Sequence, residues 1–108
     1  MNEYIQVATT VGSAEEAGAI ATLLLEKRLA ACVQVVGPMT SHYWWQGKIE
    51  TAAEYLCLAK SRGALYSDIE AAIKEIHPYE IPEIIAMPII AGSKDYLAWV
   101  AAEVREHA

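Results

Sequence analysis

The sequence predicts an α+β fold in which helices cover one face of an antiparallel sheet. Three observations indicate it: strand and helix patterns alternate along the 108 residues, a two-residue turn joins the middle strands, and no Gly/Ser/Pro-rich linker divides the chain. A chain of this length fits one folding unit, so we expect residues 1–108 to form a single domain.

The beginning of the chain predicts a strand followed by a helix. Residues 4–9 are rich in β-branched and aromatic side chains, as strands are. Ser13 with Glu16 three residues later is typical of a capping box at a helix start. We expect the helix to end near residues 27–28, where Lys and Arg suit its C-terminus. Its apolar residues recur at helical spacing: Ala17, Ile20, Ala21, Leu24 and Leu25.

The middle of the chain predicts a long hairpin. Residues 31–36 and 40–45 have strand character, and Gly37-Pro38 interrupts them as a bulge or bend would. Gln46-Gly47 is a plausible two-residue turn, and residues 48–59 return as the next strand. Trp44 and Trp45 then lie near the tip, where we expect them to serve in packing or as interface anchors.

This register separates the two cysteines. A turn centred on Gln46-Gly47 places Cys32 opposite Ser61 and Cys57 opposite Val36, and a bulge would shift this by about one residue. We therefore expect no cross-strand disulfide. Both thiols have apolar sequence neighbours and are expected to be buried and reduced in a cytosolic protein.

The last third predicts a helix, a strand and a second helix. Helical spacing extends over residues 64–76, and residues 83–90 form an apolar strand whose Pro88 favours a sheet edge. Ser93 is the expected cap of the final helix, with Asp95 in its first turn. One face of that helix is expected to carry Tyr96, Trp99, Val100 and Val104.

The order of these elements specifies a topology. Two strand–helix–strand units joined by a hairpin give the ferredoxin-like βαββαβ arrangement, here with an added C-terminal helix. Right-handed crossovers place both main helices on one face of the antiparallel sheet. The other face is left open, and with 55% hydrophobic residues we expect another subunit to cover it.

Composition excludes several classes of function. The net charge is −6 and the eight basic residues are scattered, which argues against a nucleic-acid partner. No run of eighteen apolar residues predicts a membrane span. The first residues lack the basic stretch of a signal peptide, so we expect a cytoplasmic protein without a membrane partner.

The segment from His77 to Glu83 concentrates polar chemistry. It holds one imidazole, one phenol and two carboxylates, and its two prolines stiffen an extended linker between a helix and a strand. It is a plausible place for a metal or a small ligand. The alternative is a simple helix stop, with His77 near the helix end and Pro78 blocking continuation.

Four segments in order along the chain together resemble one family. They are LAAC at residues 29–32, YWWQGKI at 43–49, HPYEIPEI at 77–84 and DYLAW at 95–99. Any one alone is weak, but in register the chain resembles the CutA divalent-cation tolerance family from end to end. The resemblance implies a PII-like homotrimer whose hairpins reach across to neighbouring subunits. It also implies a link to divalent-metal tolerance, with copper binding in some members and no settled enzymatic activity.

The metal ligands of that family carry over only in part. Some relatives are described as using a cysteine late in the first strand and a histidine pair before the proline, which correspond here to Thr9 and to Ile76-His77. Thr9 and Ile76 are poor ligands for soft or borderline ions. The expected metal ligands are therefore His77, Glu80 and Glu83, completed by a neighbouring subunit and holding copper or another divalent cation weakly.

Two other hypotheses stay open beside the metal-responsive trimer. A PII-like binding or signalling module would hold a small ligand, such as a small anion, or a partner loop in the intersubunit cleft, with Lys60, Arg62 and Tyr79 lining it. An enzyme would use His77 with Glu80 or Glu83 as acid and base. The chain has no nucleophile elbow, P-loop, dinucleotide fingerprint or zinc-protease motif, so we predict no enzyme and no catalytic residues.

Overall fold

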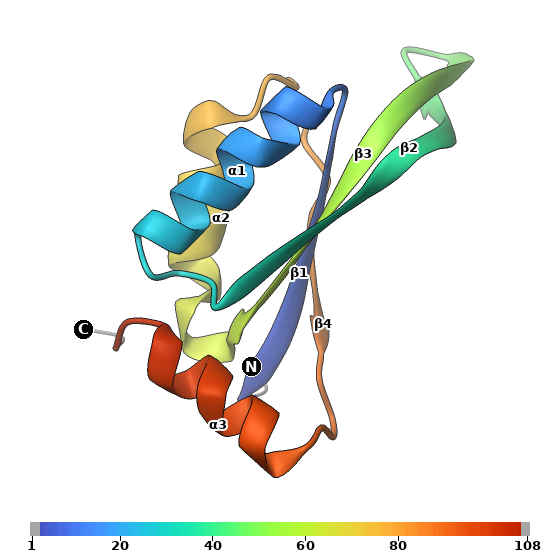
Figure 1. The fold of residues 1–108 in the computed structure, drawn as a ribbon. Helices are drawn as coiled ribbons and strands as arrows, with labels where there is room; N and C mark the ends of the chain where they lie inside the picture. The colour runs from blue at the N-terminus through green and yellow to red at the C-terminus, as the bar shows by residue number, and fades with distance from the viewer. Residues whose placement is uncertain (1–2, 107–108) are drawn as a thin grey trace.

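The computed structural model describes residues 3–106 and has the ferredoxin-like α+β fold that the sequence predicts. A single antiparallel sheet has the strand order β2-β3-β1-β4, and α1 and α2 lie side by side on one face of it (Figure 1). In chain order the elements are β1 (Tyr4–Val11), α1 (Ala14–Glu26), β2 (Cys32–Trp45), β3 (Lys48–Arg62), the 3₁₀ turn η1 (Gly63–Leu65), α2 (Tyr66–Ile76), β4 (Ile84–Pro88) and α3 (Lys94–Glu103).

The core lies between the sheet and the two helices. Alternate residues of β1 face the helices, because successive side chains of a strand point to opposite faces. Full burial of one such aliphatic side chain contributes about 1.5–3 kcal/mol to folding. The largest fully buried side chains include Ile5, Val7, Val11, Ile20, Leu24, Ile69 and Ile73.

The hairpin of β2 and β3 extends beyond the end of β1 as a projecting arm (Figure 1). Gln46 and Gly47 have φ values of 50° and 79° at its tip, as the predicted two-residue turn requires. The predicted bulge is present at Gly37-Pro38, where the pairing shifts between Val36 and Met39. A side chain at position 37 would force Tyr55 to shift, since an added Cβ would lie 2.6 Å from a ring carbon of Tyr55.

The bulge changes the register near the cysteines by one residue. Cys32 lies opposite Lys60, and Cys57 lies opposite Val35. The prediction that the two thiols do not face each other is confirmed, and both are free. Cys57 is buried, which raises the pKa of its thiol, whereas Cys32 is partly exposed rather than buried as expected.

The predicted caps are confirmed at both ends of the chain. The Ser13 hydroxyl accepts a hydrogen bond from the Glu16 backbone N–H at 3.1 Å, and the Ser93 hydroxyl accepts one from the Tyr96 N–H at the same distance. Strand β1 is longer than predicted because Val11 still pairs with Tyr55. Strand β4 is shorter than predicted and lies at a sheet edge, as expected for a strand ending in proline.

The last helix divides its apolar side chains between the core and the surface. Val100 and Val104 are buried, while Tyr96 and Trp99 stay partly exposed with ring centroids 5.6 Å apart. The segment is held by an ion pair of Arg105 with Asp68 at 3.0 Å. No helix within residues 3–106 is long and apolar enough to cross a membrane.

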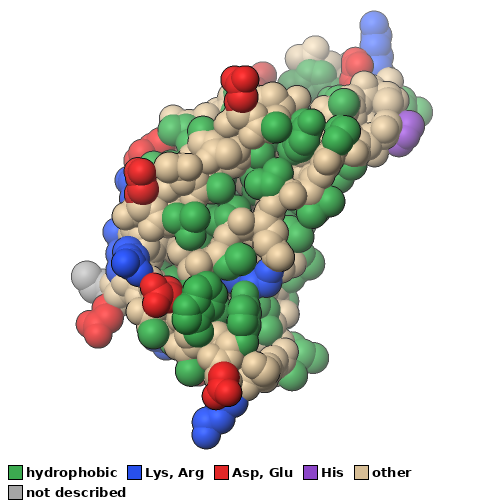
Figure 2. All heavy atoms as spheres, in the orientation of Figure 1, with side chains coloured by type: hydrophobic (Ala, Val, Ile, Leu, Met, Phe, Trp, Pro, Cys, Tyr) green, Lys and Arg blue, Asp and Glu red, His purple; other side chains and the backbone are tan. Residues whose placement is uncertain are grey.

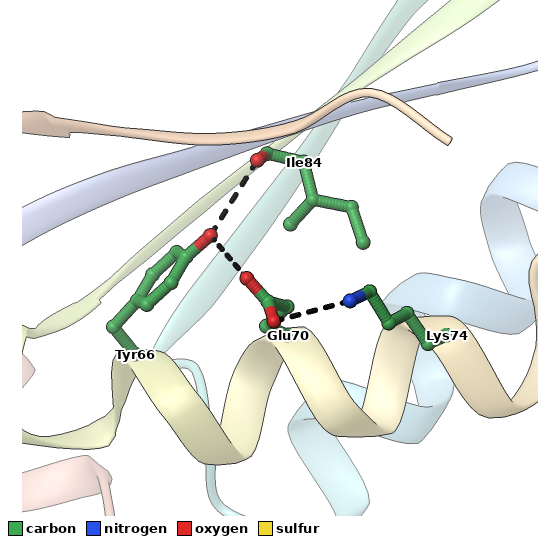
Figure 3. A network of polar contacts seen from close by, with 4 residues as sticks. All are labelled: Tyr66, Glu70, Lys74 and Ile84. Carbon is green, nitrogen blue, oxygen red and sulfur yellow. Dashed lines mark hydrogen bonds and ion pairs between the residues drawn. The ribbon is translucent and has the colours of Figure 1, made fainter. Parts of the chain in front are cut away.

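A polar network ties α2 to the edge strand (Figure 3). The Tyr66 hydroxyl donates to a Glu70 carboxylate oxygen at 2.9 Å and lies 3.4 Å from the Ile84 carbonyl oxygen. The Lys74 ammonium lies 3.3 Å from the other Glu70 oxygen. The hydrogen bond from Tyr66, followed by the contact with Lys74, lowers the pKa of Glu70, so this network serves to position the helix.

Apolar side chains remain exposed on the sheet face without helices and along the arm. Val36 is 53% exposed and Ile85 is 49% exposed on that face, and Trp44 is 72% exposed on the arm. Figure 2 shows hydrophobic side chains gathered over the middle of the visible surface and onto the arm. Monomeric proteins seldom leave large contiguous apolar surfaces in water, so this surface is suited to an interface.

Candidate functional site

His77 ends α2 and turns its ring toward the end of β1. Its Nε2 lies 2.9 Å from the Thr10 carbonyl oxygen, and its Nδ1 lies 3.1 Å from the backbone nitrogen of Tyr79. A carbonyl oxygen only accepts and a backbone N–H only donates, so the proton must be on Nε2. Both ring nitrogens are thus used within the subunit, and metal binding at either one would break a hydrogen bond.

Tyr79 reaches from the same linker to β3. Its hydroxyl donates to a carboxylate oxygen of Glu54 at 2.7 Å, and Glu54 is only 6% exposed. Burial, followed by the hydrogen bond to Glu54, raises the pKa of Tyr79 well above its usual value. The Tyr79 ring also packs edge-on against His77, with centroids 4.9 Å apart. The linker is therefore fastened to β1 and β3 at once.

A cavity of about 640 Å³ opens between this linker and the arm. One wall comes from the linker, another from the arm, and Glu54 and Thr10 contribute from the strands between them. Its size is that of a site for a small molecule. The lining residues are Thr10, Ser41, His42, Tyr43, Trp44, Trp45, Glu54, Tyr79, Glu80, Ile81 and Glu83.

The expected ligand set is brought together only in part. Glu80 and Glu83 both line the cavity, whereas His77 is not among its lining residues and directs its ring to β1. Within residues 3–106 no three His, Cys, Asp or Glu side chains form a group that could hold a metal ion. The assignment of His77, Glu80 and Glu83 as metal ligands stays a prediction.

Thr9 and Ile76, the two further positions that the sequence resemblance pointed to, are unsuited to metal binding here. Thr9 is 2% exposed, and its hydroxyl oxygen is buried without a hydrogen-bond partner among the described residues. Ile76 is partly exposed at the end of α2. Neither offers a thiolate or imidazole beside His77, as the sequence indicated.

Glu54 and His42 are among the lining residues that were not assigned a role from sequence. Glu54 is a buried carboxylate on β3 that meets Tyr79 from 25 positions later in the chain. His42 lies on the arm, with Nδ1 3.2 Å from the Thr51 hydroxyl. The sequence feature that could have identified Glu54 is its position directly before the apolar residues 55–58 of a predicted strand.

Fold and site together define a class of protein: ferredoxin-like subunits with a long hairpin arm and a polar linker before the last strand. The chain belongs to the family described as CutA1 divalent ion tolerance protein, whose sequence profile matches residues 5–103. The divalent-cation tolerance protein CutA of Thermus thermophilus is 44% identical over 100 residues, which are 93% of this chain and 95% of that protein.

Solved structures of the family have the same fold. CutA1 from Oryza sativa superposes with a TM-score of 0.94 at 38% identity, covering 97% of this chain and 96% of that one. A protein from Archaeoglobus fulgidus, described as the periplasmic divalent cation tolerance protein CutA, gives a TM-score of 0.87 at 41% identity, covering 90% of this chain and 94% of that one. The family resemblance seen in the sequence is confirmed.

Proposed function

We propose that this chain is a one-domain subunit of a cytoplasmic homotrimer that acts in tolerance of divalent cations, and that it binds copper or another divalent ion weakly through His77, Glu80 and Glu83. The observation that carries this proposal is the carboxylate wall of the cavity, where Glu80 and Glu83 lie on the linker that His77 begins. Membership of the divalent ion tolerance family supports a role that involves divalent cations. The role is one of binding, without a catalytic step.

The weakness of metal binding follows from the hydrogen bonds of His77. A metal at Nε2 displaces the proton donated to Thr10, and a metal at Nδ1 displaces the hydrogen bond from Tyr79. Each lost hydrogen bond costs about 0.5–1.5 kcal/mol. Ligands from a neighbouring subunit complete the coordination, and copper(II) binds best among common divalent ions because it favours imidazole and heads the affinity series.

Calorimetric titration of copper(II) tests the metal site. Wild type, His77→Ala and the control His42→Ala are compared, since His42 is the other histidine near the cavity. We expect His77→Ala to lose most of the affinity and His42→Ala to retain it. Equal affinity in wild type and His77→Ala would place the site elsewhere.

The trimer is supported by the apolar residues that stay exposed on the arm and the open sheet face. Light scattering coupled to size exclusion should give three times the subunit mass of 11.8 kDa. A monomer or dimer at micromolar concentration contradicts the proposal. Cell fractionation tests the compartment, because the Archaeoglobus fulgidus relative is described as periplasmic.

A PII-like module that binds a small ligand is the second candidate. Two observations favour it: the His77 nitrogens are already used, and the cavity of about 640 Å³ has the size of a metabolite site. Absence of copper binding to both wild type and His77→Ala would support this module over the metal-binding protein.

A further inference from the structure

The linker from His77 to Glu83 is attached to the sheet by few contacts. No helix or strand includes residues 78–82, and among residues 3–106 no backbone–backbone hydrogen bond involves them. Most of their side chains are exposed, with Ile81 at 71% and Tyr79 at 37%. A segment with little buried apolar surface and no backbone pairing opens at a low cost in free energy. The polar contacts of His77 and Tyr79 are therefore the main attachments of the linker.

The ring of His77 has one nitrogen that is suited to a metal ion. Its Nε2 carries the proton and donates it to the Thr10 carbonyl oxygen at 2.9 Å, which fixes the ring against β1. Histidines that bind metals usually donate their other ring N–H to a backbone carbonyl or a carboxylate in this way. The remaining lone pair is on Nδ1, and it accepts the Tyr79 backbone N–H at 3.1 Å. The ring is thus oriented for a ligand at Nδ1, but Tyr79 occupies that position.

Tyr79 is held at Nδ1 by its own side chain. The hydroxyl donates to the buried Glu54 carboxylate at 2.7 Å, and a hydrogen bond to a charged acceptor is stronger than one between neutral groups. The hydroxyl and the backbone N–H belong to one residue, so the contact with Glu54 on β3 keeps the N–H on His77. The Tyr79 ring adds an edge contact with the imidazole, with centroids 4.9 Å apart. Loss of the hydroxyl therefore removes the strongest of these attachments.

We propose that Tyr79 is a positioning residue that keeps the Nδ1 lone pair of His77 closed, and that breaking its hydrogen bond to Glu54 makes this nitrogen available. In the closed arrangement, Nδ1 accepts the Tyr79 N–H. In the open arrangement, the linker moves off Nδ1 while the hydrogen bond from Nε2 to Thr10 continues to orient the ring. The link to divalent cations rests on the proposed function, whereas the closing of Nδ1 does not.

Labelling with diethyl pyrocarbonate measures the availability of Nδ1 without any metal, because the reagent acylates the unprotonated ring nitrogen. The intact oligomer is labelled with EDTA present, and peptide mass spectrometry compares the rate at His77 with that at His42 in the same molecules. We expect Tyr79→Phe to raise the His77 rate about tenfold, because a hydrogen bond to a buried charge is lost. Equal His77 rates in wild type and Tyr79→Phe overturn the proposal.

Tyr66→Phe is the matched control, because it also removes a tyrosine hydrogen bond to a carboxylate, that of Glu70 at 2.9 Å on α2. Its His77 rate should equal that of wild type. An equal rise in both Phe variants would show a general loosening of the fold and overturn the proposal. If Tyr79→Phe fails to fold, Tyr79→Phe combined with Glu54→Leu removes donor and acceptor together and should give the same rise.

Titration of copper(II) into the same variants gives a readout that a merely structural role would move in the opposite direction. We expect Tyr79→Phe to bind copper about tenfold more tightly than wild type, because Nδ1 no longer has to be released. A copper affinity equal to or below that of wild type would overturn the control of metal binding by Tyr79. If no variant binds copper but the labelling difference is present, the metal function fails and the closing of Nδ1 by Tyr79 stands.

Discussion

On the helix side of the sheet Ile5, Val7 and Val11 are almost completely buried, whereas Val36 and Ile85 on the opposite face are about half exposed. Both faces carry apolar residues at alternate strand positions, but α1 and α2 cover only one of them. The comparison teaches that alternating apolar residues in a strand show which face of the sheet is apolar. Whether that face is buried depends on what packs against it. In the proposed trimer, neighbouring subunits would cover the open face and the arm.

The largest effect is expected on the covered face. Ile73→Ala removes a fully buried side chain of α2, and we expect a loss of about 2–5 kcal/mol in the free energy of unfolding. Urea denaturation measures it, and the oligomer mass from light scattering should stay that of wild type. Ile85→Ala on the open face is the matched control, and it should lower the oligomer mass at micromolar concentration because it weakens subunit contacts. The same behaviour in both variants would remove the distinction between the faces.

A smaller effect, expressed in assembly, is expected on the arm. Trp45→Ala should cost about 2 kcal/mol or more of subunit association, as truncation of a central aromatic anchor does. Light scattering and thermal melting report it as a reduced mass and a reduced Tm. Glu50→Gln, at an exposed polar position of the same arm, is the control. An unchanged mass and Tm in Trp45→Ala would make Trp45 an ordinary surface residue.

The linker from His77 to Glu83 is held against the sheet by the Tyr79 hydroxyl, and Tyr79→Phe tests that contact. The variant leaves the buried Glu54 carboxylate without its hydroxyl donor, which we expect to cost about 1–3 kcal/mol. The pKa of Tyr79 is raised from 10.0 in the folded protein, so its contribution is complete below pH 10.0 and is lost as the pH rises further. The stability difference between wild type and variant should therefore shrink in alkaline urea titrations. A constant difference would contradict this role of the hydroxyl.

The smallest effect, no change at all, is expected on reduction. Cys32 and Cys57 are free and lie opposite Lys60 and Val35 rather than each other. Oligomer mass and Tm should be the same with and without reductant. A mass deficit of two hydrogens that reductant restores would show a disulfide and contradict the register.

Local signals were sufficient to predict most of the fold. The caps at Ser13 and Ser93 and the turn at Gly47 depend on residues within a few positions, so the sequence specifies them directly. Element ends were less predictable because they depend on partners. Strand β3 continues to Arg62, beyond the predicted residue 59, because β1 pairs with it as far as Tyr4.

The candidate site shows the same division. The sequence identified the linker and its polar residues, but it did not show where the His77 ring points, because that is decided by the Thr10 carbonyl of a distant strand. It also missed Glu54, whose contact with Tyr79 requires the path of the linker across β3. Spacing along the chain predicts which groups are near one another only within a helix turn, a hairpin or a short loop.

The projecting arm has a consequence for the order of folding. Trp45 pairs with Lys48 across a two-residue turn, so the hairpin closes a very short loop and can form within microseconds. The edge pairing of Ile5 with Pro88 instead joins residues from opposite ends of the chain. Closing a long loop costs entropy before its contacts contribute, which makes such pairings late. We expect the hairpin of the arm to form first and β4 to pair with β1 last. The linker that borders the cavity should therefore become ordered only near the end of folding.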